Sequence, residues 1–464
     1  MSDTNNVLSI VSLKKYFPVG KGSLFSKQKK WLRANENVTL SIRKGETFAL
    51  VGESGCGKST LGRTLLQLYR PTFGEMIYRG ETLCSFLPSY LFKTLKTAKI
   101  YHALYQKSDR TEREEEKLRK SARIFGGFLT LRAEGFEETA SLLLKRFTLL
   151  SRRAESQQQI EIDKRLEEIK KENEENAEFQ KWEEFLDDGI DLSQLLEKEL
   201  RALRKNLQII FQDPYSSLNP RMTVGQMIEE GVATHQFYKR GTPQMQEYVL
   251  SVMKSCGLQP YMLHRYPHQF SGGQRQRVCI ARALAVRPQF VVCDECVSAL
   301  DVSIQSQILN LLADLKEKEG LTYLFISHDL SVVRHVSDRV AVMYLGEISE
   351  TGETEEIFNN PRHPYTIALL SAVPSASSQE TSSERILLQG HMPSPVSPPS
   401  GCKFHTRCFM AQEICQRNPA PLVEVEKGHF VACHFATVST AQKRAIAKKQ
   451  GSNAQKERLK EKEN

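Results

Sequence analysis

Long apolar runs are absent from this sequence. No stretch of its 464 residues approaches the roughly 18 consecutive apolar residues that cross a bilayer. Residues 1–7 are polar and lack the apolar segment of a secretory signal. We therefore expect the chain to stay in the cytosol, so that another subunit must supply any membrane-spanning part.

Proline is absent between Pro88 and Pro214, and internal repeats are absent throughout. Residues 85–205 are instead rich in Glu, Lys, Arg, Gln and Leu. Apolar residues recur there at i, i+4 and i+7, as in Ile162, Leu166 and Ile169. This spacing is typical of amphipathic helices. It predicts a charged helical insertion, with the narrow apolar stripes of a hairpin or short coiled coil.

The net charge of +9 points to two alternatives. A basic chain can bind nucleic acid or anionic lipid. Much of the excess, however, lies in short runs such as residues 27–30 and the tail from residue 442 onward. We interpret these runs as solvated surface charge and expect no nucleic-acid partner.

Residues 52–59, GESGCGKS, have the spacing of a phosphate-binding loop between a predicted strand and a predicted helix. Glycines let backbone N–H groups turn toward phosphates, and the helix N-terminus favours anions. In such a loop Lys58 reaches the β- and γ-phosphates, and Ser59 is a ligand of Mg²⁺.

A second strand, residues 290–293, ends in Asp294 and Glu295. A buried strand delivers such carboxylates to the edge of the sheet beside the phosphate loop. We expect Asp294 to hold Mg²⁺ through water and Glu295 to polarise the attacking water.

Three more polar groups follow predicted strands or precede a predicted helix. Gln212 and His328 each follow an apolar run, and SGGQ at 271–274 precedes a helix. Alone, each has a purely structural interpretation. Together with the loop and the acids they form an ordered set that chance does not explain.

The order of these motifs, with SALD at 298–301, resembles the ATP-binding cassette (ABC) family over residues 1–84 and 206–345. The resemblance implies catalytic roles for Glu295, His328 and Gln212, and metal ligation by Ser59, Gln212 and Asp294. It implies nucleotide contacts from Tyr16 (or Phe17) on adenine and from Gly52, Ser54, Gly55, Gly57, Lys58, Ser59, Thr60, Asp294, Ser271, Gly272, Gly273, Gln274 and Asp301. Residues 271–274 would contact ATP held by a partner cassette.

Longer segments are similar to the cassettes of oligopeptide and dipeptide importers. They are QDPYSSLNPR at 212–221, YPHQFSGGQ at 266–274, SALDVSI at 298–304, NPRHPY at 360–365, SPVSPPSGC at 394–402 and FHTRC at 404–408. Val297 indicates the second of the two paired cassettes. Two features depart from the family: Cys296 replaces a proline, and the insertion is far longer than expected.

This resemblance implies an ATPase that powers peptide import from the cytoplasmic face of the inner (plasma) membrane. Its partners would be a sister ATPase, two transmembrane permeases and, indirectly, a substrate-binding protein. The alternatives are a soluble ABC ATPase acting on ribosomes or nucleic acid, and a regulatory or scaffolding cassette.

Four of the ten cysteines cluster near the C-terminus: Cys402, Cys408, Cys415 and Cys433. In a cytosolic chain such a cluster favours a metal over disulfides. Four thiolates suit zinc or an iron–sulfur cluster, and the resemblance favours a 4Fe–4S cluster. Four unpaired thiols are the other possibility.

The predicted fold is α/β, a nucleotide-binding domain with a RecA-like core and antiparallel β and helical subdomains. That domain comprises residues 1–84 and 206–345, interrupted by the insertion at 85–205. A C-terminal extension and linker at 346–400, a Cys-rich metal-binding module at 401–435 and a basic disordered tail at 436–464 follow.

Overall fold

The structure is a computed structural model that describes residues 5–19, 30–152, 157–373 and 386–448. The chain forms two compact units. Unit 1 comprises Met1–Val11 and Gly74–Leu203, and unit 2 comprises Ser12–Phe73 and Arg204–Asn464. The strand β1 (Asn6–Val19) begins in unit 1 and ends in unit 2, where β2 (Lys30–Arg43) follows.

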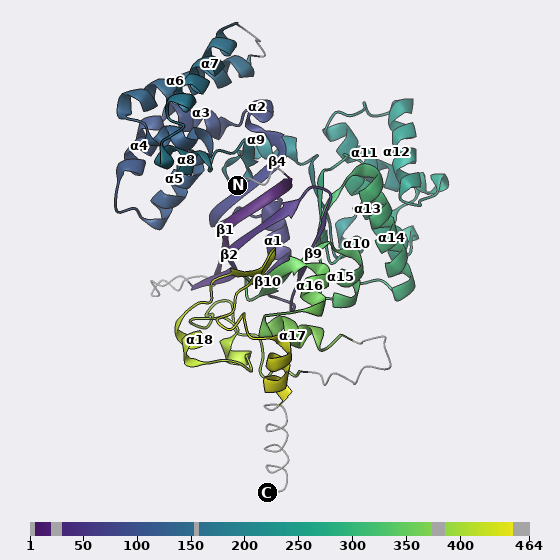
Figure 1. Ribbon diagram of the computed structural model, residues 1–464. Coiled ribbons are helices and arrows are strands. Elements are labelled where there is room, and N and C mark those ends of the chain that lie inside the picture. The colour runs from purple at the N-terminus through teal and green to yellow at the C-terminus, as the bar shows by residue number, and fades with distance from the viewer. Residues whose placement is uncertain (1–4, 20–29, 153–156, 374–385, 449–464) are drawn as a thin grey trace, which may run out of the picture. The chain divides into compact units, whose positions relative to one another are not determined.

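Unit 2 contains an eight-stranded sheet in the order β11-β12-β10-β9-β3-β8-β7-β6 (Figure 1). Its strands are β3 (Thr47–Val51), β6 (Leu207–Ile210), β7 (Phe290–Asp294), β8 (Thr322–Ile326), β9 (Arg339–Tyr344), β10 (Glu347–Glu353), β11 (Val423–Glu426) and β12 (His429–Val431). From β9 to β6 all neighbours are parallel, whereas β10, β12 and β11 pair antiparallel. The central strands are buried along their whole length, which explains their continuous apolar sequences.

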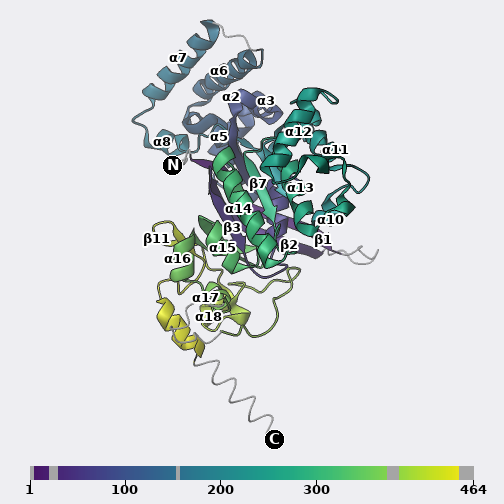
Figure 2. The ribbon, with the colours of Figure 1, turned by 90° about the vertical axis from the view of Figure 1, so that its right-hand side faces the viewer.

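Helices surround this sheet. They are α1 (Lys58–Leu65), α10 (Pro214–Ser217), α11 (Val224–Thr234), α12 (Pro243–Ser255), α13 (Gly272–Leu284), α14 (Val302–Glu319), α15 (Leu330–Val336), α16 (Thr354–Asn359), α17 (Pro364–Leu370) and α18 (Glu413–Arg417), with 3-10 turns η3 (Pro260–His264), η4 (Pro267–Gln269) and η5 (His405–Arg407). The helix α13 packs against α10, α11, α12 and α14 and forms a helical subdomain with them. Figure 2 shows α14 and α15 in front of β7 and β3.

Unit 1 holds β4 (Phe73–Thr82), which pairs antiparallel with the short strand β5 (Gly189–Asp191). Its helices are α2 (Leu83–Phe86), α3 (Ser89–Lys96), α4 (Ala98–Gln106), α5 (Glu112–Phe125), α6 (Ala133–Ser151), α7 (Gln157–Glu172), α8 (Ala177–Glu183) and α9 (Glu197–Leu203), with 3-10 turns η1 (Gly126–Thr130) and η2 (Leu192–Gln194). The prediction of a simple hairpin or coiled coil for this region was wrong. The helices α6 and α7 do pack together, but the other helices enclose a further core.

Aromatic rings account for this larger core. Phe125 packs against Phe136 with ring centroids 5.1 Å apart, and Phe128 packs against Phe179 at 5.9 Å. All four side chains are buried. The aromatic residues are spread over more than fifty positions, so that no short periodic pattern in the sequence reveals them.

A buried ion network joins β4 to the helices of unit 1. Glu75 is fully buried and accepts hydrogen bonds from Arg119 and Arg123. Arg123 also contacts Asp187 at 3.0 Å, and Arg79 contacts the same carboxylate at 2.6 Å. The carboxylates of Glu75 and Asp187 are thus both paired with guanidinium groups within unit 1.

The C-terminal region belongs to the sheet of unit 2, so the separate Cys-rich module predicted at 401–435 is not confirmed. The strand β12 pairs with β10, and His429 on β12 lies 2.8 Å from the buried carboxylate of Glu350 on β10. Phe404 is part of the main apolar core. This region therefore has no need to bury a core of its own.

Part of the predicted disordered tail, residues 436–464, is helical. Residues 440–448 form a helix, and the amine of the buried Lys443 donates to the carbonyl oxygen of Arg362. Residues 449–464, and residues 374–385 of the predicted linker, lie outside the described residues.

Candidate functional site

The loop at residues 52–59, called the phosphate loop below, connects β3 to α1 as predicted. Two of its glycines are required by close approach of other backbone. A Cβ on Gly57, whose φ is +108°, would lie 2.1 Å from the carbonyl oxygen of Ala34. A Cβ on Gly52 would lie 2.2 Å from the carbonyl oxygen of Met343. Any larger residue would therefore displace the loop.

Lys58, the first residue of α1, folds back over the phosphate loop. Its amine donates to the carbonyl oxygens of Gly52 at 2.8 Å and Glu53 at 3.0 Å. The side chain is 4% exposed. The loop thus holds one cation at its centre, as a site for an anionic ligand requires.

Asp294 ends β7 next to the start of α1. Its Oδ1 accepts a hydrogen bond of 2.5 Å from Ser59 Oγ, and its Oδ2 lies 3.4 Å from Arg63 Nη2. Mg²⁺ prefers one or two protein oxygens together with water and phosphate oxygens. A hydroxyl and a carboxylate side by side match that preference, so the two residues fit a nucleotide-bound Mg²⁺.

Gln212, Glu295 and His328 follow the neighbouring parallel strands β6, β7 and β8, and they meet at one atom. Glu295 Oε2 accepts from Gln212 Nε2 at 2.9 Å and lies 3.3 Å from His328 Nδ1. Glu295 has a left-handed backbone with φ +47°. The carboxyl ends of adjacent parallel strands share one sheet edge, which is why residues 116 positions apart converge here.

A cavity of about 250 Å³ opens at this edge. Of the predicted site residues, it is lined by Ser54, Gly55, Gly57, Lys58, Ser59, Thr60, Gln212 and Glu295. The structure therefore brings the phosphate loop and two of the predicted catalytic side chains to one hollow. Gly52, Asp294 and His328 contact its lining residues without lining it themselves.

The predicted signature residues do not line this cavity. Ser271 caps the start of α13: its hydroxyl accepts from the N–H of Gln274, whose side chain accepts from the N–H of Ser271. Asp301 caps α14 by accepting from the N–H of Ile304 at 3.0 Å. Gly272 and Gly273 form the first turn of α13, and a Cβ on Gly273 would lie 2.4 Å from Ile304 Cγ2.

Tyr16 does not line the cavity, but it contacts a residue that does. Its hydroxyl donates to Glu36 at 2.6 Å, and the guanidinium of Arg33 lies 5.9 Å from its ring centre. Arg33 itself lines the cavity. The predicted adenine contact thus sits behind a residue that the sequence reasoning did not single out.

Sequence reasoning also missed residues from far along the chain. Pro395 lines the cavity, and its carbonyl oxygen accepts from the N–H of Arg33 at 3.0 Å. Tyr365 and Arg407 both contact Glu53 in the phosphate loop. All three fall in motifs shared with importer cassettes, but no spacing rule places residues some 300 positions away beside the loop.

The four C-terminal cysteines lie near one another. Burial, with smaller contributions from the neighbouring Cys433 and Cys415, raises the pKa of Cys402 to about 11 and that of Cys408 to about 12. Cys408 and Cys433 accept backbone N–H groups at their sulfur atoms. Yet the described part of the chain contains no three His, Cys, Asp or Glu side chains arranged to hold a metal ion. The predicted metal centre is therefore not confirmed.

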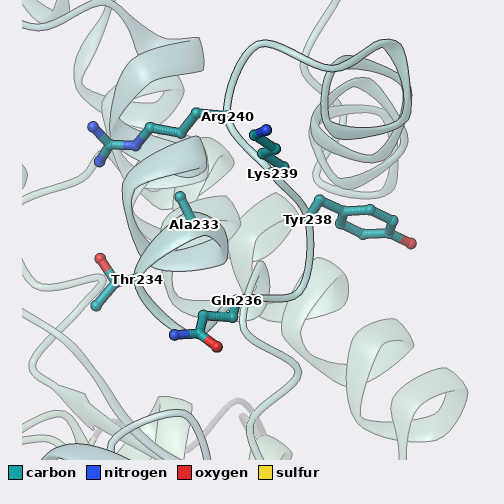
Figure 3. Close-up of a pocket in the computed structure, with 6 residues that line it drawn as sticks. All are labelled: Ala233, Thr234, Gln236, Tyr238, Lys239 and Arg240. Atoms are coloured by element: carbon teal, nitrogen blue, oxygen red, sulfur yellow. The ribbon is translucent and has the colours of Figure 1, made fainter.

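A second hollow, of about 440 Å³, lies at the end of α11 (Figure 3). Figure 3 shows Ala233 and Thr234 on the helix and Tyr238, Lys239 and Arg240 on the loop that follows. Among the residues that the structure describes, neither an acid nor a glycine turn lines it. Despite its size, it lacks the groups that the nucleotide site combines.

Comparison with known proteins agrees with the site. The family model described as "ABC transporter" matches residues 35–184 and 141–298, and that described as "Oligopeptide/dipeptide transporter, C-terminal region" matches residues 349–415. The oligopeptide transport ATP-binding protein AppF of Bacillus subtilis is 38% identical over 94% of this chain and 98% of its own length. The dipeptide transport ATP-binding protein DppF of Haemophilus influenzae is 37% identical, over 93% and 98%.

Among solved structures, the dimeric ABC transporter cassette MJ0796 is 20% identical, with a TM-score of 0.45 over 75% of this chain and 98% of that one. The family model and the relatives, together with the phosphate loop, define an ABC ATPase. The chain belongs to the family of ATP-binding proteins of oligopeptide and dipeptide ABC transporters. It is an ATPase that uses ATP and Mg²⁺, and the ribosome or nucleic-acid alternative is not supported.

Proposed function

We propose that this chain hydrolyses ATP to power peptide import, as a peripheral subunit on the cytoplasmic face of the inner (plasma) membrane. The convergence of Gln212, Glu295 and His328 beside the phosphate loop carries the ATPase part. The names of the relatives and the match to the transporter C-terminal region support the peptide substrate. In the described residues no helix is long and apolar enough to cross a bilayer.

In this proposal, the phosphate loop binds ATP. Backbone N–H groups of Ser54, Gly55, Gly57 and Thr60 and the amine of Lys58 bind the phosphates, and Gly52 gives the loop room to turn. Ser59 and Asp294, with Gln212, hold Mg²⁺, which neutralises charge on the phosphates. Tyr16 stacks on the adenine.

The three side chains that meet at Glu295 Oε2 catalyse hydrolysis in this proposal. Glu295 polarises the attacking water, because a carboxylate held by two neighbours is fixed in position as an acceptor. His328 faces the same oxygen from β8 and orients it. Gln212 links this carboxylate to the cavity wall, so that nucleotide binding and water positioning are coupled.

The signature residues serve a partner in this proposal. Ser271, Gly272, Gly273, Gln274 and Asp301 stand apart from the chain's own cavity, at the starts of α13 and α14. Helix N-termini attract anions. The signature residues would contact ATP held by a sister ATPase. The working unit is therefore a heterodimer of the two ATPases bound to two transmembrane permeases. A substrate-binding protein acts on this unit indirectly.

An iron–sulfur cluster at Cys402, Cys408, Cys415 and Cys433, with zinc as the alternative, remains part of the proposal. The proximity of Cys415 and Cys433 to Cys402 and Cys408, which contributes to the raised pKa values of the latter two, supports it. The N–H donors at two sulfurs support it as well. Anaerobic purification with iron and zinc analysis and visible absorption tests it. Neither metal in stoichiometric amount, with all four thiols reactive, would refute it.

The experiment for the whole proposal is affinity purification of the tagged chain from membranes. We expect two permeases and a second ATPase to co-purify. A Lys58→Ala variant serves as a control for nucleotide-dependent association. Ribosomal proteins in place of permeases would overturn the transport assignment.

A further inference from the structure

The C-terminal region reaches back to the phosphate loop through one cation. Arg407, in η5, directs its Nη1 at both carboxylate oxygens of Glu53, at distances of 2.9 and 3.1 Å. The arginine is 8% exposed and the glutamate 28%. Glu53 is the second residue of the phosphate loop, 354 positions away in the sequence. A charge-assisted pair so shielded from water is among the stronger side-chain contacts.

Glu53 is also held at its backbone. Its N–H donates to the hydroxyl of Tyr365 at 2.9 Å, and its carbonyl oxygen accepts from the amine of Lys58 at 3.0 Å. Tyr365 is fully buried on α17. A continuous chain of contacts therefore runs from Arg407 through Glu53 to the lysine at the centre of the loop.

The residues around Arg407 pack closely against one another. Phe404 lies against the rings of Tyr344 at 5.1 Å and Tyr365 at 5.3 Å. The guanidinium of Arg407 lies 5.9 Å from the ring centre of Tyr344. Because this aromatic cluster is buried, it holds the guanidinium of Arg407 beside Glu53.

The charges of Arg407 and Glu53 affect the binding of ATP. The phosphate loop receives a polyanion, yet Glu53 places a carboxylate within it. An unpaired negative charge there would repel the triphosphate and draw Lys58 toward itself. Arg407 supplies the matching positive charge from outside the loop and leaves Lys58 available for the ligand.

We propose that Arg407 is a positioning residue for ATP binding, which neutralises Glu53 and so keeps Lys58 in place for the phosphates. It acts through Glu53 and contacts no substrate. The inference rests on the proposed ATPase site and assigns a role in that site to the C-terminal transporter region.

The test is a double-mutant cycle on the full chain, read as the Kd of a fluorescent ATP analogue. We expect Arg407→Ala to weaken binding about 10-fold, the scale of one charge-assisted hydrogen bond. Glu53→Gln alone changes the Kd little, and Glu53→Gln restores binding to Arg407→Ala, because the unpaired charge is gone. The KM for ATP rises in Arg407→Ala while kcat stays near the wild-type value.

A matched control lies in the same region. Arg417, on α18, is 72% exposed and pairs with Glu413, four residues earlier in the same helix. Arg417→Ala removes the same charge from the chain and is expected to leave ATP affinity unchanged. Equal losses in Arg407→Ala and Arg417→Ala would show a general charge effect and overturn the proposal.

Two further outcomes would overturn it: wild-type affinity in Arg407→Ala, or no rescue by Glu53→Gln, which is the result of a purely structural role. If Arg407→Ala does not fold, Arg407→Gln replaces it in the cycle, and wild-type affinity in that variant contradicts the proposal. A wild-type chain that binds no ATP would instead refute the proposed function.

Discussion

The backbone of Glu295 is left-handed, an uncommon conformation for a residue with a side chain. Such strain is found where a site needs a side chain in one direction. Here it follows directly after the buried end of β7 and turns the carboxylate toward Gln212 and His328. The proposed chemistry thus depends on a residue with an uncommon backbone conformation.

Replacing this carboxylate by its amide tests that role. We expect Glu295→Gln to lower steady-state phosphate release of the membrane complex by roughly 10²–10⁴-fold, the range for a general base. ATP affinity should stay near the wild-type value, since the phosphate loop is untouched. Glu317→Gln, on the exposed side of α14, is the control. A Glu295→Gln complex that keeps more than half the wild-type rate contradicts the assignment.

The glycines of the phosphate loop allow an equally specific comparison. Gly57→Ala places a Cβ 2.1 Å from a carbonyl oxygen, whereas Gly45→Ala, also at positive φ, meets nothing within 4 Å. Alanine in a left-handed backbone conformation destabilises each variant by roughly 1–2 kcal/mol. Only Gly57→Ala also displaces the loop. Nucleotide titration should show lost ATP binding in Gly57→Ala and normal binding in Gly45→Ala. Equal affinities would mean that the loop tolerates the clash.

At the scale of elements, the sheet edge could be predicted well from sequence. The strands β6, β7 and β8 are short and mostly apolar, and each is followed within two residues by a polar side chain of the site. Parallel strands must bring those side chains together. The contact of β12 with β10 could not be predicted. It joins His429 to Glu350 across 79 residues, and neither strand has a strong apolar alternation.

The start of β10 carries a pH-sensitive group. Burial raises the pKa of Glu347 to about 7, opposed by Lys403 and helped by Glu36. When folding raises the pKa of a carboxyl group, that group stabilises the folded state fully at pH values below its pKa in the unfolded chain. This stabilisation is lost as the pH rises to its pKa in the folded protein. The wild type should therefore lose stability on going from about pH 4.5 to about pH 7.

Glu347→Gln removes this dependence. Its stability advantage over the wild type should be small near pH 5 and grow to at most about 3 kcal/mol near pH 8. Urea unfolding of the two proteins across this range measures the difference. An advantage that stays constant with pH, or that grows as pH falls, would contradict the burial of this carboxyl.

The helices α2 to α8 of unit 1 lie between two residues, Leu83 and Asp188, that contact each other. The N–H of Leu83 donates to the carbonyl oxygen of Asp188 at 2.6 Å, so a short Gly/Ser linker can replace residues 84–187. Glu75 would lose its guanidinium partners and is changed to Gln in the same variant. We expect ATP affinity to be retained. A shortened chain that does not fold would show that these helices are integral to the nucleotide-binding core.

At the scale of the whole molecule, residues from both ends of the sequence build one nucleotide site. The phosphate loop comes early, the three converging side chains come from the middle, and Pro395 and Arg407 come from the transporter C-terminal region. The signature residues lie outside this site, so the isolated chain is expected to be a weak ATPase. Motif order predicted the class of protein because each motif performs one chemical task, but it could not predict contacts between distant loops.

The most direct test of the central claim is uptake of a labelled peptide by cells that lack this chain. The account predicts that uptake is lost, that the wild-type chain restores it, and that Glu295→Gln, although expressed and membrane-bound, does not. Peptide uptake that is unchanged without the chain, or fully restored by Glu295→Gln, would contradict a peptide importer driven by ATP hydrolysis at this site.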